Sequence, residues 1–273
     1  MNYQTFEIAS AQNKMFKKFK SLTLKKYRER EHLFLMEGQR YVQTAIENGF
    51  EFEAFIFDTM TWSKEEMLFL QTNVFENAQI YILSESLFKE LTQTEQSQGI
   101  IGVLPLKDPK DISKLIELKS TCKINNILML DRIQDPGNLG TIIRTADAAG
   151  VDGIILIKGT VDPYNAKVIR SSAGSILNVD LVEVDNAVDA INLLKLAGYH
   201  IVVTALEGAV DYDDKANYRD KNCLVIGNEA NGVSDELIEG SDIRVKIPIV
   251  GRAESLNASV AAGIMMYKLQ SRK

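Results

Sequence analysis

The second half of the chain alternates short apolar segments with longer segments of helical periodicity. The apolar segments predict strands at Ile127–Leu130, Gly153–Ile157, Val179–Val184, His200–Thr204, Cys223–Ile226 and Ile243–Ile247. The segments between them predict helices at Leu139–Ala149, Pro163–Ala173, Ala187–Ala197, Val233–Glu239 and Ser255–Leu269. Strands this apolar predict an α/β fold, with a parallel sheet covered by helices on both faces. Such sheets bind ligands beyond the carboxyl ends of their strands, so a site is expected in the loops that follow the strands.

The first hundred residues are less regular. They predict strands at Ala54–Phe57, Ile80–Leu83 and Gly99–Leu104, and helices at Phe34–Gly49 and Ser63–Thr72. The segment that follows is polar, carries two prolines near its start and predicts a linker with a short helix. We therefore predict a smaller α/β domain over residues 1–105, a linker over 106–123 and a second domain over 124–273.

Composition limits the class of protein. At about 150 residues per domain, 273 residues agree with two domains, and 45% hydrophobic with 25% charged residues is ordinary for a folded chain. The longest apolar runs are strand-sized, and the N-terminus has no apolar signal core, which predicts neither a membrane span nor secretion. Two cysteines, Cys122 and Cys223, are too few for a disulfide framework or a four-thiolate zinc site. These features predict a cytoplasmic protein, and they suggest no metal.

Charge is unevenly distributed. The formal net charge is −6, yet the stretch from Lys14 to Arg30 holds eight basic residues and one acidic residue. A basic arm on an acidic body can bind phosphates. The same stretch carries Met15, Phe16, Phe19 and Leu22 at helical spacing, so an ordinary amphipathic helix with a solvated lysine face explains the pattern equally well.

Two loops after predicted strands have unusual content. The first begins at Asp131 and reads DRIQDPGNLGTIIRTA, which puts Asn138 beside a helix N-terminus, where its side chain can cap. Arg144 follows among small and branched apolar residues, as a surface residue or as a phosphate clamp. The second loop, GNEANGVS from Gly227, has the glycine spacing of a P-loop, but Val233 replaces the required lysine, which excludes a nucleotide triphosphatase. It presents Glu229 at the sheet edge.

The third loop leads into a helix rich in small residues. Ser255 suits the N-cap, and the helix behind it can pack closely, either inside the fold or at a dimer face. The chain has no G-x-G-x-x-G segment, and its two histidines, His32 and His200, support no hydrolase triad.

Together the three loops are more specific than any one of them. DPGNLGTIIRTADAAG, IGNEANGVS and KIPIVGRAESLNASVAAG resemble the three motifs of the SpoU (TrmH-like) RNA 2′-O-ribose methyltransferases of the SPOUT superfamily, over about residues 126–273. TVDPYNAKVIRSSAGS is also similar to the family. The first hundred residues, with their basic start and FLMEGQRYVQTAI, resemble the substrate-binding domain that many members carry.

The resemblance implies a fold, a cofactor and a partner. It implies that the C-terminal SPOUT sheet contains a deep trefoil knot that binds S-adenosylmethionine, and that the protein works as a homodimer through its C-terminal domain. The implied cofactor-binding residues are Thr204, Ala205, Leu206, Gly208, Gly227, Asn228, Gly232, Ile247, Leu256 and Ala258. The implied catalytic and substrate-positioning residues are Arg144, Asn138, Glu229, Ser255 and Asn257. We expect RNA to be bound by Lys14, Lys17, Lys18, Lys20, Lys25, Lys26, Arg28 and Arg40.

The implied activity is methyl transfer from S-adenosylmethionine to a ribose 2′-hydroxyl in structured RNA, with ribosomal RNA as the expected substrate. A transfer RNA methyltransferase and a non-catalytic RNA-binding protein of ribosome assembly remain alternatives. We expect Arg144 to clamp a neighbouring phosphate rather than act as the base, because a guanidinium does not deprotonate in proteins. The proton would leave through phosphate, water or Glu229. Asn138 and Asn257 would hold the geometry of loop and ribose, and Ser255 would cap the helix or donate a hydrogen bond.

Overall fold

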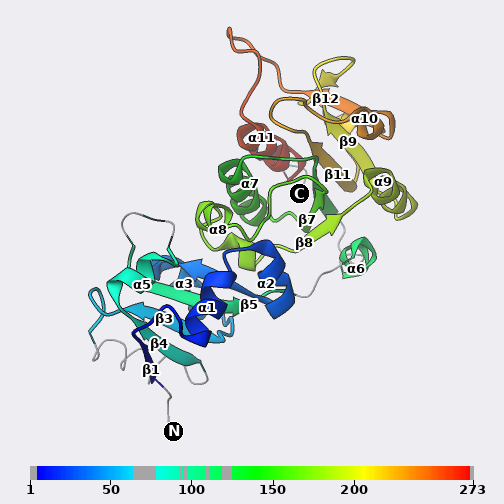
Figure 1. Ribbon diagram of the computed structural model, residues 1–273. Coiled ribbons are helices and arrows are strands. Elements are labelled where there is room, and N and C mark those ends of the chain that lie inside the picture. The colour runs from blue at the N-terminus through cyan, green and yellow to red at the C-terminus, as the bar shows by residue number, and fades with distance from the viewer. Residues whose placement is uncertain are drawn as a thin grey trace. The chain divides into compact units, whose positions relative to one another are not determined.

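The protein is described by a computed structural model that covers residues 5–63, 78–92, 94, 97–107, 111–118 and 125–270 (Figure 1). Contacts divide the chain into two units. The first comprises Met1–Asp108 with Tyr164–Arg170, and the second comprises Pro109–Pro163 with Ser171–Lys273. The segment Tyr164–Arg170 lies in the sequence predicted for the second domain, yet it packs with the first unit. The helix predicted at Ser63–Thr72 falls outside the described residues.

The first unit is built on a five-stranded mixed sheet. Its strand order is β1-β4-β3-β5-β2, with β1, β4 and β3 parallel to one another and β5 and β2 antiparallel to their neighbours. The strands are β1 (Thr5–Ile8), β2 (Leu33–Glu37), β3 (Ala54–Asp58), β4 (Gln79–Leu83) and β5 (Ile100–Pro105). The helices are α1 (Lys14–Ser21), α2 (Lys25–Glu31), α3 (Gln39–Glu47) and α5 (Glu85–Lys89).

Helices cover both faces of this sheet. Phe16 and Phe19 of α1 pack in one apolar cluster with Ile56 of β3. Val42 of α3 packs in another cluster with Phe55 of β3. Successive residues of a strand point to opposite faces, so α1 and α3 lie on opposite sides of the sheet.

The prediction of a helix over Phe34–Gly49 was wrong at its beginning. Residues 33–37 form β2, which pairs with β5, and α3 begins only at Gln39. Gly38, with a φ of 113°, separates the two elements. The short apolar run is typical of both a strand and a buried helix, and pairing with β5 selects the strand. The basic stretch also forms two helices, α1 and α2, rather than one, and β1 was not predicted.

The second unit is built on a seven-stranded sheet in which every neighbouring pair is parallel. The order is β10-β12-β9-β11-β6-β7-β8. The strands are β6 (Asn125–Leu130), β7 (Gly153–Ile157), β8 (Leu181–Val184), β9 (His200–Thr204), β10 (Val210–Asp211), β11 (Lys221–Ile226) and β12 (Ile243–Lys246). All six predicted strands are present, and β10 was not predicted.

Helices connect these strands. They are α6 (Ile112–Leu118), α7 (Pro136–Ala149), α9 (Ala187–Leu196), α10 (Asp235–Glu239) and α11 (Ala258–Gln270), with 3₁₀-helices η1 (Ser175–Leu177) and η2 (Lys215–Asn217). The helix predicted at Pro163–Ala173 is shorter, α8 (Ala166–Ser171), and all but its last residue belong to the first unit. None of the described helices combines the length and apolar character that a membrane span requires.

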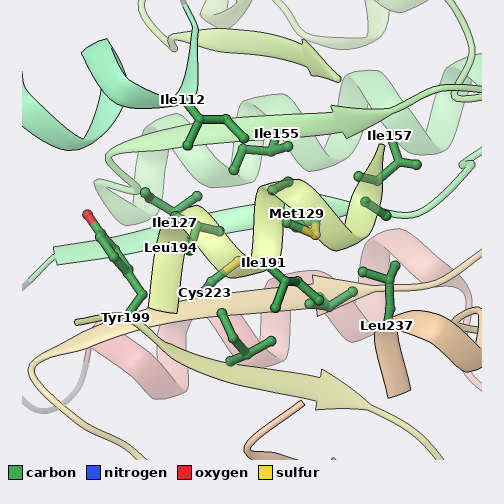
Figure 2. Packing of buried hydrophobic residues seen from close by; sticks show 14 of the residues in the cluster. Ile112, Ile127, Met129, Ile155, Ile157, Ile191, Leu194, Tyr199, Cys223 and Leu237 are labelled. Carbon is green, nitrogen blue, oxygen red and sulfur yellow. The ribbon is translucent and has the colours of Figure 1, made fainter. Parts of the chain in front are cut away.

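The core of the second unit lies on both faces of its sheet. On one face Ile191 and Leu194 of α9 and Leu237 of α10 pack on strand residues such as Met129 and Ile155 (Figure 2). On the other face α11 packs against α7 and β11 (Figure 1). This arrangement confirms the predicted α/β class with a parallel sheet covered on both sides. The trefoil knot implied by the resemblance stays a prediction.

The packing of α9 can be tested with two neighbouring leucines. Leu194 is fully buried in the cluster of Figure 2, whereas Leu193 is 43% exposed. We expect Leu194→Ala to lower the free energy of unfolding of this unit by about 2–5 kcal/mol, because it leaves a cavity. The control Leu193→Ala should change it by less than about 0.5 kcal/mol. Denaturant unfolding of the full chain measures both, and equal effects would contradict this packing.

Candidate active site

Four loops meet at the carboxyl edge of the large sheet. β12, β9, β11 and β6 are consecutive neighbours and all parallel, so the loops that follow them begin side by side. Thr204 at the end of β9 is level with Val245, and Ile226 at the end of β11 is level with Leu130. The residues proposed for catalysis or cofactor binding belong to these four loops or to the helices that two of them enter, except Thr204, which is the last residue of β9. Parallel sheets place ligand sites at this edge.

Glu229 joins two of these loops. Its carboxylate accepts hydrogen bonds from the backbone amides of Gln134 (3.1 Å) and Asp135 (3.2 Å) and from Asn138 Nδ2 (3.0 Å). Asn138 Oδ1 in turn accepts a hydrogen bond of 2.9 Å from Asn257 Nδ2, at the start of α11. The loops after β6, β11 and β12 are therefore connected by one chain of hydrogen bonds, Glu229–Asn138–Asn257.

The hydrogen bonds control the charge of Glu229. Partial burial by itself would raise its pKa, but the hydrogen bonds from Asn138, from Gln134, from its own amide and from Asp135 outweigh burial, and the pKa lies below its ordinary value. A carboxylate that accepts several hydrogen bonds is a weak base. The geometry therefore favours an anchoring role for Glu229 over its expected part in accepting the substrate proton.

Two helix caps differ from the sequence prediction. The N-cap of α7 is Asp135, whose side chain accepts from the Asn138 amide at 2.8 Å, so Asn138 does not cap the helix and is available to Glu229. The helix predicted from Ser255 begins at Ala258, and Asn257 caps it by accepting from the amides of Ser259 and Val260. Ser255 is exposed, and the structure shows no hydrogen bond from its side chain to a described residue.

The loop after β11 closes on itself. Asn228 and Gly232 exchange two backbone hydrogen bonds of 2.9 Å, and Asn228 Oδ1 accepts from the amides of Ala230 and Asn231. A Cβ on Gly227 would lie 2.2 Å from the carbonyl carbon of Gly232, so only glycine fits there. These contacts explain why the loop needs glycine at 227 and asparagine at 228. The expected role of both residues in binding a cofactor stays a prediction.

The other residues proposed for the cofactor line the same edge. Thr204 Oγ1 donates to Val225 O at 3.0 Å, and Ala205 N donates to Val245 O at 3.1 Å, which fixes the beginning of the loop after β9. Leu206, 64% exposed, and Gly208 lie further along this loop at the surface. In the last loop and at the start of α11, the half-buried members are Ile247, Leu256 and Ala258.

Arg144 lies apart from the hydrogen-bond chain. It is exposed on α7, six residues and therefore about 9 Å along the helix from Asn138. Its side chain has no hydrogen bond or ion pair with any residue that the structure describes. A guanidinium in this state is available to an external anion, as a phosphate clamp requires.

The proposed RNA-binding residues fall into different environments. Arg28 is buried and donates to Leu22 O at 2.7 Å, which favours a structural role and takes it out of the proposed RNA surface. Lys20 and Lys25 pair with Glu90 and Glu29. Further members are Lys17, which donates to Gln12, and Lys18, which is 3.7 Å from Glu31. Within the described residues Lys14, Lys26 and Arg40 have exposed side chains without an ion pair, and Arg40 lies on α3, across the sheet from α1.

Sequence reasoning missed a second polar group at this edge. Asp131, 1% exposed, accepts from Arg132 Nε at 2.8 Å and from the Ser234 amide at 2.8 Å. The sequence contains a signal for this group, because Asp131 directly follows an apolar strand, and a carboxylate that is buried there needs hydrogen-bond partners. Among the described residues no group of three or more His, Cys, Asp or Glu side chains is arranged to hold a metal ion.

Two family models match the chain. One describes the SpoU rRNA Methylase family and matches residues 125–267, and the other describes an MRM3-like substrate binding domain and matches residues 13–102. The parallel sheet and the loops at its carboxyl edge lie within the match to the rRNA methylase model, which places the chain in a class of RNA methylases. The chain is a member of the SpoU rRNA methylase family, which confirms the resemblance seen in its three loops.

Individual relatives agree with this membership. The chain is 36% identical to the Bacillus subtilis 23S rRNA (guanosine(2553)-2′-O)-methyltransferase RlmP, over 97% of this chain and 99% of the relative. A crystal structure of an AdoMet-bound rRNA methyltransferase from Sinorhizobium meliloti superimposes with a TM-score of 0.83 at 31% identity, covering 98% of both chains. An Aquifex aeolicus tRNA (guanosine(18)-2′-O)-methyltransferase is 39% identical, but over only 37% of this chain and 47% of its own length.

The anchoring role of Glu229 predicts a pH-dependent stability. Because its pKa is lowered in the folded chain, its carboxylate stabilises the fold at every pH above the ordinary glutamate value of about 4.3 and loses this contribution as the pH falls through the lower folded value. We expect Glu229→Gln to lower the melting temperature equally between pH 8 and pH 5, and by progressively less below about pH 4.3.

Thermal unfolding across this pH range measures the effect. Glu254→Gln is the matched control, because Glu254 is exposed and has no hydrogen bond or ion pair with a described residue. A Glu229→Gln effect that is independent of pH would contradict the anchoring role.

Proposed function

We propose that this protein transfers the methyl group of S-adenosylmethionine to a 2′-hydroxyl of ribose in ribosomal RNA. The hydrogen-bond chain Glu229–Asn138–Asn257 carries the proposal, because it joins the three loops that hold the family's motifs at the carboxyl edge of the sheet. Membership of the SpoU family and the AdoMet-bound Sinorhizobium relative support the same reaction and cofactor. We expect the enzyme to act in the cytoplasm.

The reaction is an in-line displacement, so its main requirement is alignment. The attacking oxygen has to approach the methyl carbon opposite the departing sulfur, and holding two reactants in this geometry is worth about 7–11 kcal/mol. The residues of the loops after β9, β11 and β12 would hold the cofactor. Glu229, Asn138 and Asn257 would keep these loops in position, and Arg144 would bind a phosphate beside the target ribose.

The proton of the 2′-hydroxyl needs another acceptor than Glu229. Glu229 already accepts hydrogen bonds from three neighbouring residues and has a lowered pKa. We therefore expect the proton of the 2′-hydroxyl to pass to the phosphate held by Arg144 or to water. Arg144 is not the base, because its guanidinium is too weak an acid to lose the proton that it would have to lose before it could accept another.

Ribosomal RNA is favoured over transfer RNA by the part of the chain outside the catalytic unit. The relative that acts on 23S rRNA matches almost the whole chain, whereas the relative that acts on tRNA matches a little over a third of it. The first unit, with its match to a substrate binding domain, is therefore proposed to select the RNA. Its proposed contacts are phosphates at α1 and α2, where the side chains of Lys14 and Lys26 have neither a hydrogen bond nor an ion pair with a described residue.

A second copy of the chain is the proposed partner of the catalytic unit. α7 and α11 pack on each other, and α11 leaves Val260 and Tyr267 half exposed, while Val250 in the preceding loop is 97% exposed. Apolar side chains on adjacent segments favour contact with another protein surface. A homodimer through this part of the fold would cover them.

Arg144 provides the test of the proposed reaction. The chain is incubated with methyl-labelled S-adenosylmethionine and total RNA from cells that lack the gene, and the label is mapped after digestion. Arg144→Lys should lose turnover by about 100-fold, because lysine cannot replace a bidentate clamp, while its affinity for S-adenosylhomocysteine stays unchanged. Label on a ribose 2′-oxygen of 23S rRNA is expected from the unchanged chain.

Arg30→Lys is the matched control, an exposed arginine paired with Glu31 in the first unit. It should keep the turnover of the unchanged chain. Near-normal turnover of Arg144→Lys would contradict the clamp. Label on a base, or no label in any RNA, would contradict the proposed reaction.

A further inference from the structure

Arg132 has an unusual backbone conformation at the carboxyl edge of the large sheet. It lies two residues after the end of β6 and has a φ of 56°, a backbone angle that residues other than glycine rarely adopt. Its carbonyl accepts hydrogen bonds from Asn228 Nδ2 (2.7 Å) and Gln134 Nε2 (3.2 Å). The same loops that position Glu229 thus hold Arg132 in this conformation, and strained backbone of this kind is common at functional sites.

The guanidinium of Arg132 is fixed by a buried carboxylate. Asp131 accepts from Arg132 Nε at 2.8 Å and from Nη2 at 3.2 Å, and its Oδ2 also accepts from the Ser234 amide. Arg132 packs its stem on Gly159, where a Cβ would lie 3.2 Å from Arg132 Cγ. Gly159 has a φ of 98°, so both its conformation and this contact favour glycine.

One edge of this guanidinium remains open. The side chain of Arg132 is 43% exposed, and Nη1 makes no hydrogen bond with any residue in the described part of the chain. A guanidinium whose N–H groups on one edge bind a carboxylate can donate hydrogen bonds from another edge to phosphate oxygens. Its orientation is already fixed, so little conformational entropy is lost when an anion binds.

We propose that Arg132 binds a phosphate of the substrate RNA next to the nucleotide that is methylated. The backbone amide of Gln134, two residues later, donates a hydrogen bond to Glu229, and so does the side chain of Asn138, in the helix that this loop enters. Arg132 therefore belongs to the rim of the candidate active site. Arg144 and Arg132 would then hold two different phosphates of one strand. This inference rests on the proposed reaction with RNA.

The competing explanation is that Arg132 only neutralises the buried charge of Asp131. Salt dependence of RNA binding separates the two, because each phosphate contact adds about one unit to the slope of log K against log salt. We expect Arg132→Gln to raise KM for in vitro transcribed 23S rRNA about 10-fold and to reduce this slope by about 1. The turnover number and the affinity for S-adenosylhomocysteine should stay unchanged.

Lys158→Gln is the matched control. Lys158 directly follows β7, is 74% exposed and pairs with Asp185, so its replacement removes one positive charge from a neighbouring loop without a fixed guanidinium. It should leave KM and the salt slope unchanged. Arg132→Lys keeps the charge beside Asp131 but loses the second edge, so it should also raise KM, and it serves as the test if Arg132→Gln does not fold.

The outcomes separate this inference from the proposed function. If the unchanged chain methylates ribose and the two Arg132 variants keep its KM and salt slope, Arg132 is a counter-ion of Asp131 and the inference is wrong. If the unchanged chain transfers no methyl group to ribose, the proposed function fails first. A rise in KM equal to that of Lys158→Gln would also overturn the inference, because any positive charge would then have the same effect.

Discussion

The candidate active site depends on one carboxylate. Glu229 accepts hydrogen bonds from Gln134, Asp135 and Asn138, and Asn138 passes the connection on to Asn257. Three loops that are far apart in the sequence are thereby held in one arrangement. Such order is important at a site for methyl transfer, because alignment of the two substrates can supply much of the acceleration. A lowered pKa keeps Glu229 charged, so the connection persists at neutral pH.

The sheet beneath the loops makes these connections possible. Parallel pairing of β12, β9, β11 and β6 brings their carboxyl ends to one edge, and helices on both faces fix the strands. Asp131 adds a buried anchor at this edge by binding both Arg132 and the amide that precedes α10. The candidate active site is therefore formed by loops on a rigid support, and the choice of RNA is the role proposed for the first unit.

Much of the second unit could be predicted from the sequence, and the rest depends on long-range contacts. Its central strands are buried on both faces, so they leave continuous apolar runs that local patterns reveal. Phe34–Glu37 has the same appearance, and only its pairing with β5 makes it a strand. The role of Glu229 could not be derived locally either, because its partner Gln134 lies 95 residues away. The sequence predicts Ser255 as the cap of α11, but Asn257 caps the helix in the structure. Both residue types suit a cap, and the path of the loop decides between them.

The most direct test of this account is a double-mutant cycle on Asn138 and Glu229. The kcat/KM for methyl transfer to 23S rRNA would be measured for the unchanged chain, Asn138→Ala, Glu229→Gln and the double variant. If the two residues act through one connection between the loops, the double variant should lose no more activity than the more impaired single variant. Losses that multiply would show that the two residues act independently, and would contradict the central role of the hydrogen-bond chain.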